Sequence, residues 1–146
     1  IRTILNYKPE GRLTDLNIPL EYLLKIQKRK CVAFLISDFQ ATNYETNLKL
    51  VSKKHDLVAI AISDPRETNF PMIGLVHLRD SESGENLIFD TNDEEATKLY
   101  SVHARQIREK LKRLFRSTGV DTIEIRTDSA VVEPIVRYFK IREKRH

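Results

Sequence analysis

The sequence has few of the residues that define several common classes of protein. Its one cysteine, Cys31, excludes a disulfide within the chain and favours a reducing compartment, the cytoplasm. Its four glycines form no Gly-rich phosphate-binding loop. No apolar run approaches the ~20 residues of a membrane-spanning helix, and no signal-peptide pattern opens the chain. These absences exclude a secreted disulfide scaffold, a P-loop and a membrane segment within these residues.

Charge is present in both signs and is mixed along most of the chain. The 25 basic and 21 acidic residues leave a net charge of +4 in a chain of 146 residues, long enough for one domain with its own core. Basic residues concentrate at 105–116 and 137–146. Acidic residues accompany them, so the pattern favours solvated helix faces over a nucleic-acid interface.

Apolar spacing predicts two helices and two strands in the first half of the chain. The predicted elements are a helix at 14–29, a strand at 31–37, a helix at 43–55 and a strand at 56–63. Thr14 or Asp15 caps the first helix, and the second buries Tyr44, Leu48 and Val51. Because continuous apolar strands alternate with helices, the pattern indicates a parallel sheet covered on both faces, with 31–37 as a central strand.

The second half adds a hairpin, a long helix, another strand and a closing helix. The predicted elements are strands at 73–80 and 85–90 around a turn containing Gly84, a helix at 92–117 ended by Gly119, a strand at 121–127 and a helix at 129–145. The apolar stripe expected on the long helix is Ala96, Leu99, Tyr100, His103, Ile107, Leu111, Leu114 and Phe115. The residues expected to be buried on the closing helix are Val132, Ile135, Val136 and Phe139. The predicted fold class is α/β, an open and mainly parallel sheet with helices on both faces and a β-hairpin insertion.

Both apolar strands of the first half end in a Ser-Asp pair, at Asp38 and at Asp64. Open parallel sheets bind ligands at the carboxyl ends of their strands, and carboxylate and hydroxyl oxygens suit Mg²⁺ or Mn²⁺. Alternatively, each aspartate accepts hydrogen bonds from the backbone of the following turn. For Asp64, which precedes Pro65, this capping interpretation is favoured. For Asp38 both interpretations stay open.

The loop "DPRETNFP", residues 64–71, is the most unusual connection in the chain. One interpretation is a rigid link between strand and hairpin, because two prolines stiffen it. The other is a partner-binding rim beside Asp38, formed by Asp64, Arg66 and Glu67.

The histidines and the cysteine give weaker signals. None of the four histidines has metal-ligand spacing with another. His103 lies on the apolar stripe of the long helix and is expected to pack there. Cys31 begins an apolar strand, where thiols are usually buried and inert.

The order of several segments resembles known protein families. "EGRLTDL" followed by "CVAFLISDF" is similar to the second half of the metal-ion-dependent adhesion site of von Willebrand factor A domains, with Thr14 and Asp38 at the threonine and aspartate positions. The longer set resembles the bacterial domain-of-unknown-function family fifty-eight, often encoded beside MoxR-type AAA+ ATPases. Its segments are "YKPEGRLTDL", "LISDF", "KKHDLVAIAISDPRE", "PMIGLVHLRDSESGE" and "FDT".

The resemblance implies a von Willebrand factor A-like (Rossmann-like) domain over residues 1–146. The Asp-x-Ser-x-Ser that supplies the other ligands in such domains is absent from the chain, which starts at Ile1 within helical-looking sequence. The expectation is a fragment that lacks its N-terminal strand or strands. Thr14 and Asp38 alone are expected to hold Mg²⁺ or Mn²⁺ weakly or not at all, because Mg²⁺ needs several well-placed oxygens.

Two functions from different classes follow. The first is a non-enzymatic protein–protein interaction module, whose partner is a MoxR-type AAA+ ATPase or its client and which works through a divalent-metal site in the full-length protein. The second is a phosphoesterase or nuclease that uses Asp38 and Asp64 with Mg²⁺ or Mn²⁺. That chemistry needs a further carboxylate, and Glu67 is the local candidate.

Overall fold

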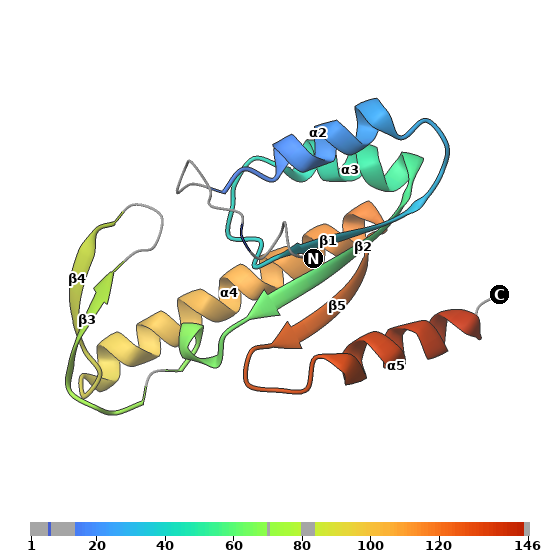
Figure 1. Cartoon of the computed structure of the whole chain (residues 1–146). Helices are drawn as coiled ribbons and strands as arrows, with labels where there is room; N and C mark the ends of the chain where they lie inside the picture. Colours follow the sequence, from blue (N-terminus) through green and yellow to red (C-terminus); the bar gives the residue numbers. More distant parts are fainter. Residues whose placement is uncertain (1–5, 7–13, 70, 80–83, 145–146) are drawn as a thin grey trace.

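The computed structural model describes residue 6 and residues 14–69, 71–79 and 84–144. Helices and strands alternate along most of this part of the chain (Figure 1). The elements are α2 (Asn17–Ile26), β1 (Val32–Ser37), α3 (Glu45–Lys54), β2 (Asp56–Ser63), the 3₁₀ turn η1 (Pro65–Glu67), β3 (Leu75–Arg79), β4 (Asn86–Asp90), α4 (Glu94–Thr118), β5 (Asp121–Arg126) and α5 (Val132–Glu143). The helical-looking start of the sequence and residues 81–83 of the expected hairpin turn lie outside the described residues.

Strands β1, β2 and β5 form a parallel sheet in the order β1-β2-β5. The prediction of an α/β fold with a parallel sheet is confirmed. The prediction that 31–37 is a central strand was wrong for the described residues, because β1 pairs there with β2 alone and β2 occupies the centre. On one face of β1 the side chains of Val32, Phe34 and Ile36 are 53%, 46% and 61% exposed. An apolar run therefore did not distinguish a central strand from an edge strand with one open face.

Helices α2 and α3 and the end of α4 cover one face of the sheet (Figure 1). The core on this face includes Leu20, Leu48, Val51 and Phe115, each at most 2% exposed. Burial of the apolar face of α3 is as the sequence predicts, since Tyr44 is also only 3% exposed. Each of these side chains contributes about 1.5–3 kcal/mol of transfer free energy when fully buried.

Helix α5 covers the other face, where Val58, Ile60, Ile123 and Ile125 form a second buried cluster. The side chains of α5 that pack on it are Ile135 and Tyr138. The predicted burial of Val132, Val136 and Phe139 was wrong, because these residues are 69%, 43% and 43% exposed. The helix is held at its end by Arg142, which pairs with Asp56 and Asp121 at the amino ends of β2 and β5. This orientation turns the flank of α5 toward the open face of β1, where the Phe34 and Phe139 ring centroids are 6.2 Å apart.

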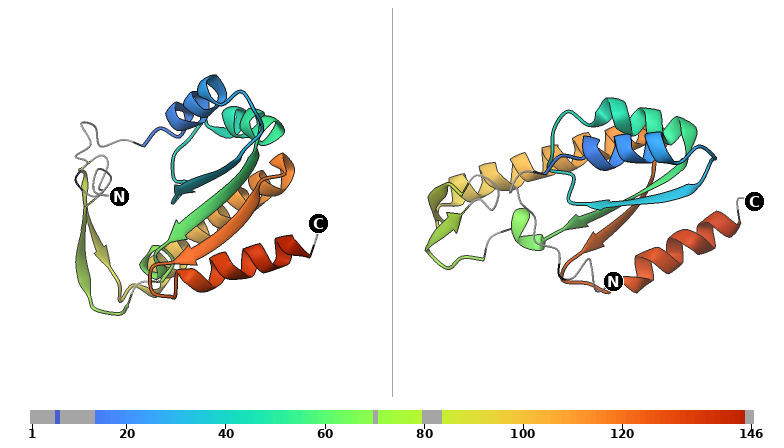
Figure 2. Two further views of the ribbon diagram at one scale, coloured as in Figure 1. Left: turned by 45° about the vertical axis from the view of Figure 1, so that its right-hand side comes forward. Right: turned by 45° about the horizontal axis from the view of Figure 1, so that its top comes forward.

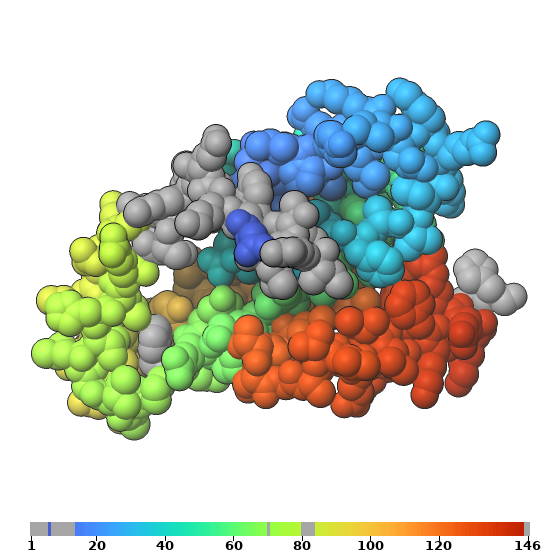
Figure 3. Space-filling model, in the orientation of Figure 1, coloured from blue at the N-terminus to red at the C-terminus, as the bar shows by residue number. Residues whose placement is uncertain are grey.

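Helix α4 is long enough to run past the sheet and carry the β3–β4 hairpin at its far end (Figure 2). Asp93 caps its first turn by accepting hydrogen bonds from two backbone N–H groups, and Gly119, at φ 69°, ends it as predicted. Beyond the sheet the predicted apolar stripe is open, and Leu99 is 65% exposed. In the space-filling view the hairpin forms a lobe at one end of an elongated molecule (Figure 3).

Candidate binding site at the carboxyl edge of the sheet

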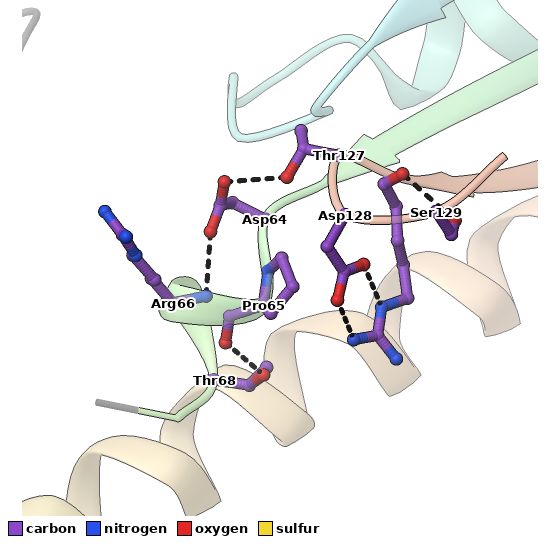
Figure 4. Close-up of polar contacts among 8 residues, drawn as sticks. Asp64, Pro65, Arg66, Thr68, Thr127, Asp128 and Ser129 are labelled. Atoms are coloured by element: carbon purple, nitrogen blue, oxygen red, sulfur yellow. Dashed lines mark hydrogen bonds and ion pairs between the residues drawn. The ribbon is translucent and has the colours of Figure 1, made fainter. Parts of the chain in front are cut away.

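Asp64 follows β2 and joins the ends of two strands (Figure 4). Its Oδ1 accepts a hydrogen bond from the backbone N–H of Arg66 at 2.8 Å, so it caps η1, as the favoured interpretation predicts. Its Oδ2 accepts a hydrogen bond from the hydroxyl of Thr127 at 2.7 Å. These two bonds, the Thr127 bond first, lower the pKa of Asp64 below its usual value because they favour the ionised carboxylate.

Thr127 is a site residue that the sequence prediction missed. It follows β5, and its backbone N–H donates to the carbonyl of Ser63 at 3.0 Å. The signal was the "RTD" that ends β5, since it repeats the pattern of a small hydroxyl residue followed by aspartate. In this third copy the aspartate, Asp128, pairs with Arg126 at 2.7 Å.

Asp38 is exposed at the end of β1, on a turn fixed by the residue that follows it. Its Oδ1 accepts a hydrogen bond from the backbone N–H of Gln40 at 3.2 Å. Phe39 is only 5% exposed and has φ 59°, a left-handed conformation that a bulky residue adopts only under tertiary constraint. Its ring contacts Tyr44 and Phe115, with centroids 6.2 Å and 5.0 Å away. Burial of Phe39 thus directs the neighbouring Asp38 to the surface.

Glu67 lies in η1 and is partly buried. Its Oε1 accepts a hydrogen bond from the Gln40 side chain at 3.4 Å, which links η1 to the turn after β1. Burial raises the pKa of Glu67, and the nearby charges of Asp38 and Asp64 raise it further. Asp38 and Asp64 therefore lie close enough to Glu67 to act on its charge, and none of the three carboxylates forms an ion pair with another described residue. Arg66 is exposed, and its guanidinium extends away from Asp64 (Figure 4).

A cleft of about 250 Å³ opens between this edge of the sheet and α4. Asp38 and Glu67 stand among its polar lining residues. Its apolar lining is Ala61, Ile62, Ala104, Ile107, Leu111 and Phe115. The small alanines on the two facing elements leave the space that larger side chains would fill.

Helix α4 also supplies polar groups to the cleft that the sequence prediction did not assign. His103 is exposed and lines the cleft, so the prediction that it packs on the apolar stripe was wrong. Arg108 lies near enough to Glu67 to oppose the rise of its pKa. Tyr100 lines the cleft as well, and burial and then Glu67 raise its pKa. Helical spacing carried the signal, because residues 100, 103 and 104 fall on one face of a helix.

Thr14 is exposed just before α2 and does not line the cleft. The side-chain amide of Asn17 donates to the carbonyl of Asn43 at 3.2 Å, so the start of α2 lies beside the loop that follows β1. Over residues 14–69, 71–79 and 84–144, no three His, Cys, Asp or Glu side chains group closely enough to hold a metal ion. The donors described here therefore do not amount to a divalent-metal site. No helix within the same ranges is long and apolar enough to cross a membrane.

Comparison with known proteins gives a family and uncharacterised relatives. Residues 1–110 match the family described as "Protein of unknown function DUF58". The chain is 32% identical over 137 residues to the uncharacterized protein MAV169 of Mycobacterium avium, covering 93% of this chain and 80% of the relative.

It is 30% identical over 147 residues to the uncharacterized proteins Rv1480 of Mycobacterium tuberculosis and Mb1516 of Mycobacterium bovis, covering 99% of this chain. It spans only 46% of the length of each of these two relatives. No solved structure matches the chain. The family match covers most of the sequence, and the chain therefore belongs to the DUF58 family of proteins of unknown function.

Proposed function

We propose that the carboxyl edge of the sheet is a protein-binding surface and that the chain acts as a non-enzymatic interaction module. The observation that carries this proposal is the position of Asp38 and Glu67 in the lining of a largely apolar cleft, with Asp64 near enough to Glu67 to raise its pKa. Their negative charge is not neutralised by an ion pair with any described residue. Exposed carboxylates beside an apolar cleft can provide both orientation and buried area to a partner.

The turns that carry these carboxylates support the proposal because they are already ordered. Asp38 is fixed by the buried Phe39, and η1 is closed by Asp64 and by the Thr68 hydroxyl, which donates to the carbonyl of Pro65 at 2.9 Å. A surface that is rigid before binding loses less conformational entropy when the partner docks.

The finer form of the proposal follows the von Willebrand factor A-like resemblance. In it, Thr14 and Asp38 are two ligands of a divalent-metal site that polypeptide beyond the described residues completes. A carboxylate of the partner then enters the coordination sphere of Mg²⁺ or Mn²⁺. The partner is a MoxR-type AAA+ ATPase or its client, and Asp64, Arg66 and Glu67 form the rim.

One observation favours a second function, a Mg²⁺- or Mn²⁺-dependent phosphoesterase. Asp38, Asp64 and Glu67 are close enough to affect one pKa, and His103 and Arg108 line the same cleft. Against it, both carboxylate oxygens of Asp64 already accept hydrogen bonds from the protein. Hydrolysis of bis-p-nitrophenyl phosphate with Mn²⁺, abolished by Asp38→Asn, would establish this function instead.

The first test measures binding of the chain to a purified MoxR-type ATPase by biolayer interferometry, with Mg²⁺ and with EDTA. Asp38→Ala is expected to weaken binding at least about tenfold, as loss of an important interface residue does. Glu109→Ala is the matched control, because Glu109 is exposed on α4 and does not line the cleft. Equal affinities for the Asp38 variant and the control would contradict the proposal.

A further inference from the structure

Cys31 lies beside a buried histidine at the amino end of β1. Its Sγ is 3.5 Å from Nδ1 of His55, the residue that follows α3. The carbonyl of Cys31 accepts a hydrogen bond from Asp56 N–H at 2.8 Å, and His55 N–H donates to the carbonyl of Val51 at 2.8 Å. Both backbones are therefore fixed by the fold, and the thiol and the imidazole are held together by it.

The second ring nitrogen of His55, Nε2, has no role in hydrogen bonding among the described residues. His55 is 2% exposed, and its Nε2 has no hydrogen-bond partner there. A buried polar atom without a partner costs about 1–3 kcal/mol, and such atoms in native proteins often mark a reactive group. Among the described residues the hydrogen-bonding contact of the ring is with the thiol, and Nδ1 lies where it can accept the thiol proton.

Cys31 is not buried, so the expectation of a buried residue was wrong. Cys31 is partly exposed and lines a groove between α2 and β1. The other walls of the groove are apolar and include Leu20, Leu23 and Leu35. A small molecule can therefore approach the sulfur along the groove from solvent.

The segment that leads into Cys31 is rich in positive charge. Lys28, Arg29 and Lys30 directly precede Cys31, and all three are exposed. The nearest acidic residue in sequence to His55 is Asp56, and Arg142 pairs with it. Reactive cysteines are characteristically found in partly exposed, electropositive surroundings, and positive charge on the adjoining segment attracts anionic reagents.

We propose that Cys31 is a site of reversible modification by anionic low-molecular-weight disulfides. Sγ attacks one sulfur of the reagent R–S–S–R while His55 Nδ1 accepts the thiol proton. A bond forms between Sγ and that sulfur, the S–S bond of the reagent breaks, and R–S⁻ leaves with the electron pair. R–S⁻ then takes up a proton, and the imidazole releases its proton to solvent. This inference does not depend on the proposed function of the carboxyl edge.

The test compares rates of modification in the folded chain and in urea. The chain has a single thiol, so absorbance with Ellman's reagent, an anionic disulfide, reports on Cys31 alone. The folded chain is expected to react at least tenfold faster than the unfolded chain. After reaction with glutathione disulfide, mass spectrometry is expected to show one glutathione attached to the chain. The cationic disulfide cystamine is expected to show no such acceleration. A folded chain that reacts more slowly than the unfolded chain would overturn the proposal.

Surface variants separate the charge effect from folding. Because Lys28, Arg29 and Lys30 are exposed, their combined replacement by glutamine leaves the fold intact. It is expected to slow Ellman's reagent several-fold without slowing cystamine, whereas Lys110→Gln with Arg113→Gln on exposed α4 positions changes neither rate. Equal slowing by both sets of variants would contradict a local effect.

The role of His55 is tested without mutating this buried residue. In the unmodified protein, ¹⁵N NMR is expected to show Nδ1 in contact with the thiol. Formation of the mixed disulfide is expected to shift the Nδ1 resonance, because the sulfur loses its proton and changes its hydrogen bonding. Unchanged ring resonances after complete modification would rule out the proposed role of His55 as the acceptor of the thiol proton.

Discussion

At the residue scale, Asp64 has the most completely defined environment of the candidate site residues. Its two carboxylate oxygens accept hydrogen bonds from Thr127 and from the backbone of Arg66, and these bonds lower its pKa. A carboxylate with a lowered pKa in the folded state adds stability above the pKa of the unfolded chain, about 3.9 for aspartate. That contribution is lost as the pH falls through the lower pKa of the folded protein.

Thr127→Val should therefore reduce thermal stability in a pH-dependent way. The variant removes the hydroxyl that stabilises ionised Asp64, so its Tm is expected to lie below that of the wild type at pH 7. The difference is expected to shrink as the pH falls through the lowered pKa of Asp64, because protonation removes the charge that the hydroxyl stabilises. Ser129→Ala, which removes an exposed hydroxyl bonded to a carbonyl, serves as the control with no such trend. A Tm difference that stays constant between pH 7 and pH 2 would disprove the assignment.

The sequence predicted the position of these carboxylates better than it predicted their partners. Asp38 and Asp64 lie at the ends of parallel strands because the strand pattern and the Ser-Asp ending are local features. Thr127 is 63 residues away from Asp64 and meets it only through the register of β2 with β5. His103 was expected to pack on the apolar stripe because helical spacing shows which residues share a face. It does not show whether that face packs on a neighbour or lines a cleft, as His103 does.

At the element scale, α3 gives a sharp test of the core assignment. Leu48 is 0% exposed, and Leu50, two residues along the same helix, is 49% exposed. Leu48→Ala is expected to lower the free energy of unfolding by about 2–5 kcal/mol, through lost transfer energy and a cavity. Leu50→Ala is expected to cost about 0.5 kcal/mol, as surface substitutions do. Urea unfolding of both variants gives the values, and similar losses would mean that the buried face is wrongly assigned.

The two edge strands of the sheet differ in their protection against further pairing. Strand β5 carries Asp121, Glu124 and Arg126, charges of the kind that keep natural sheet edges from pairing. Strand β1, "VAFLIS", has no charged residue, and alternate side chains are exposed on one face. It has the composition of an internal strand although it is an edge strand among the described residues.

A positive charge on the open face of β1 should therefore improve solubility. Ile36→Lys places an ammonium group at a side chain that is 61% exposed, so little core packing is lost. Light scattering is expected to show less self-association of the isolated chain at high concentration. The Tm is expected to stay within a few degrees of the wild type. The control is Val132→Lys on α5, a residue 69% exposed and away from the strand edge. Equal self-association of the wild type and both variants would refute a role for the β1 edge.

The end of α4 was predictable from the sequence because a glycine is a local signal. Gly119 ends α4 in the left-handed conformation as predicted, and the cap at Asp93 was not assigned from the sequence. The predicted Thr14 or Asp15 cap of the first helix was wrong, since α2 begins after Leu16, which makes no side-chain cap hydrogen bond.

Burial along α5 was only partly predictable. Of the four apolar residues expected to be buried, only Ile135 packs on the buried cluster of the sheet, and Tyr138 packs beside it. In this orientation Arg142 pairs with Asp56 and Asp121, and these ion pairs join residues far apart in the sequence.

At the scale of the whole molecule, the fold brings the carboxyl ends of three strands to one side of α4. The same side holds the cleft, and α4 continues past it to the hairpin (Figures 1 and 2). The alternation of helices and apolar strands was enough to predict a parallel α/β sheet. The cleft was not predictable, because its lining includes Ala61 of β2 and Ala104 of α4, two small residues that only the tertiary fold brings to one cleft.

Glu67 tests the central claim, because a functional and a structural role predict opposite effects on stability. Burial and neighbouring charges raise its pKa, so the ionised side chain is unfavourable in the folded protein at pH 7. Removing that charge in Glu67→Gln should leave Tm unchanged or raise it, with a gain in stability below about 1 kcal/mol because of solvent screening.

The decisive measurement is the affinity of Glu67→Gln for the MoxR-type ATPase, determined together with its Tm at pH 7. A protein-binding role for the carboxyl edge predicts that binding weakens about tenfold or more while Tm stays the same or rises. Unchanged binding, or losses of binding and Tm that occur together, would contradict it.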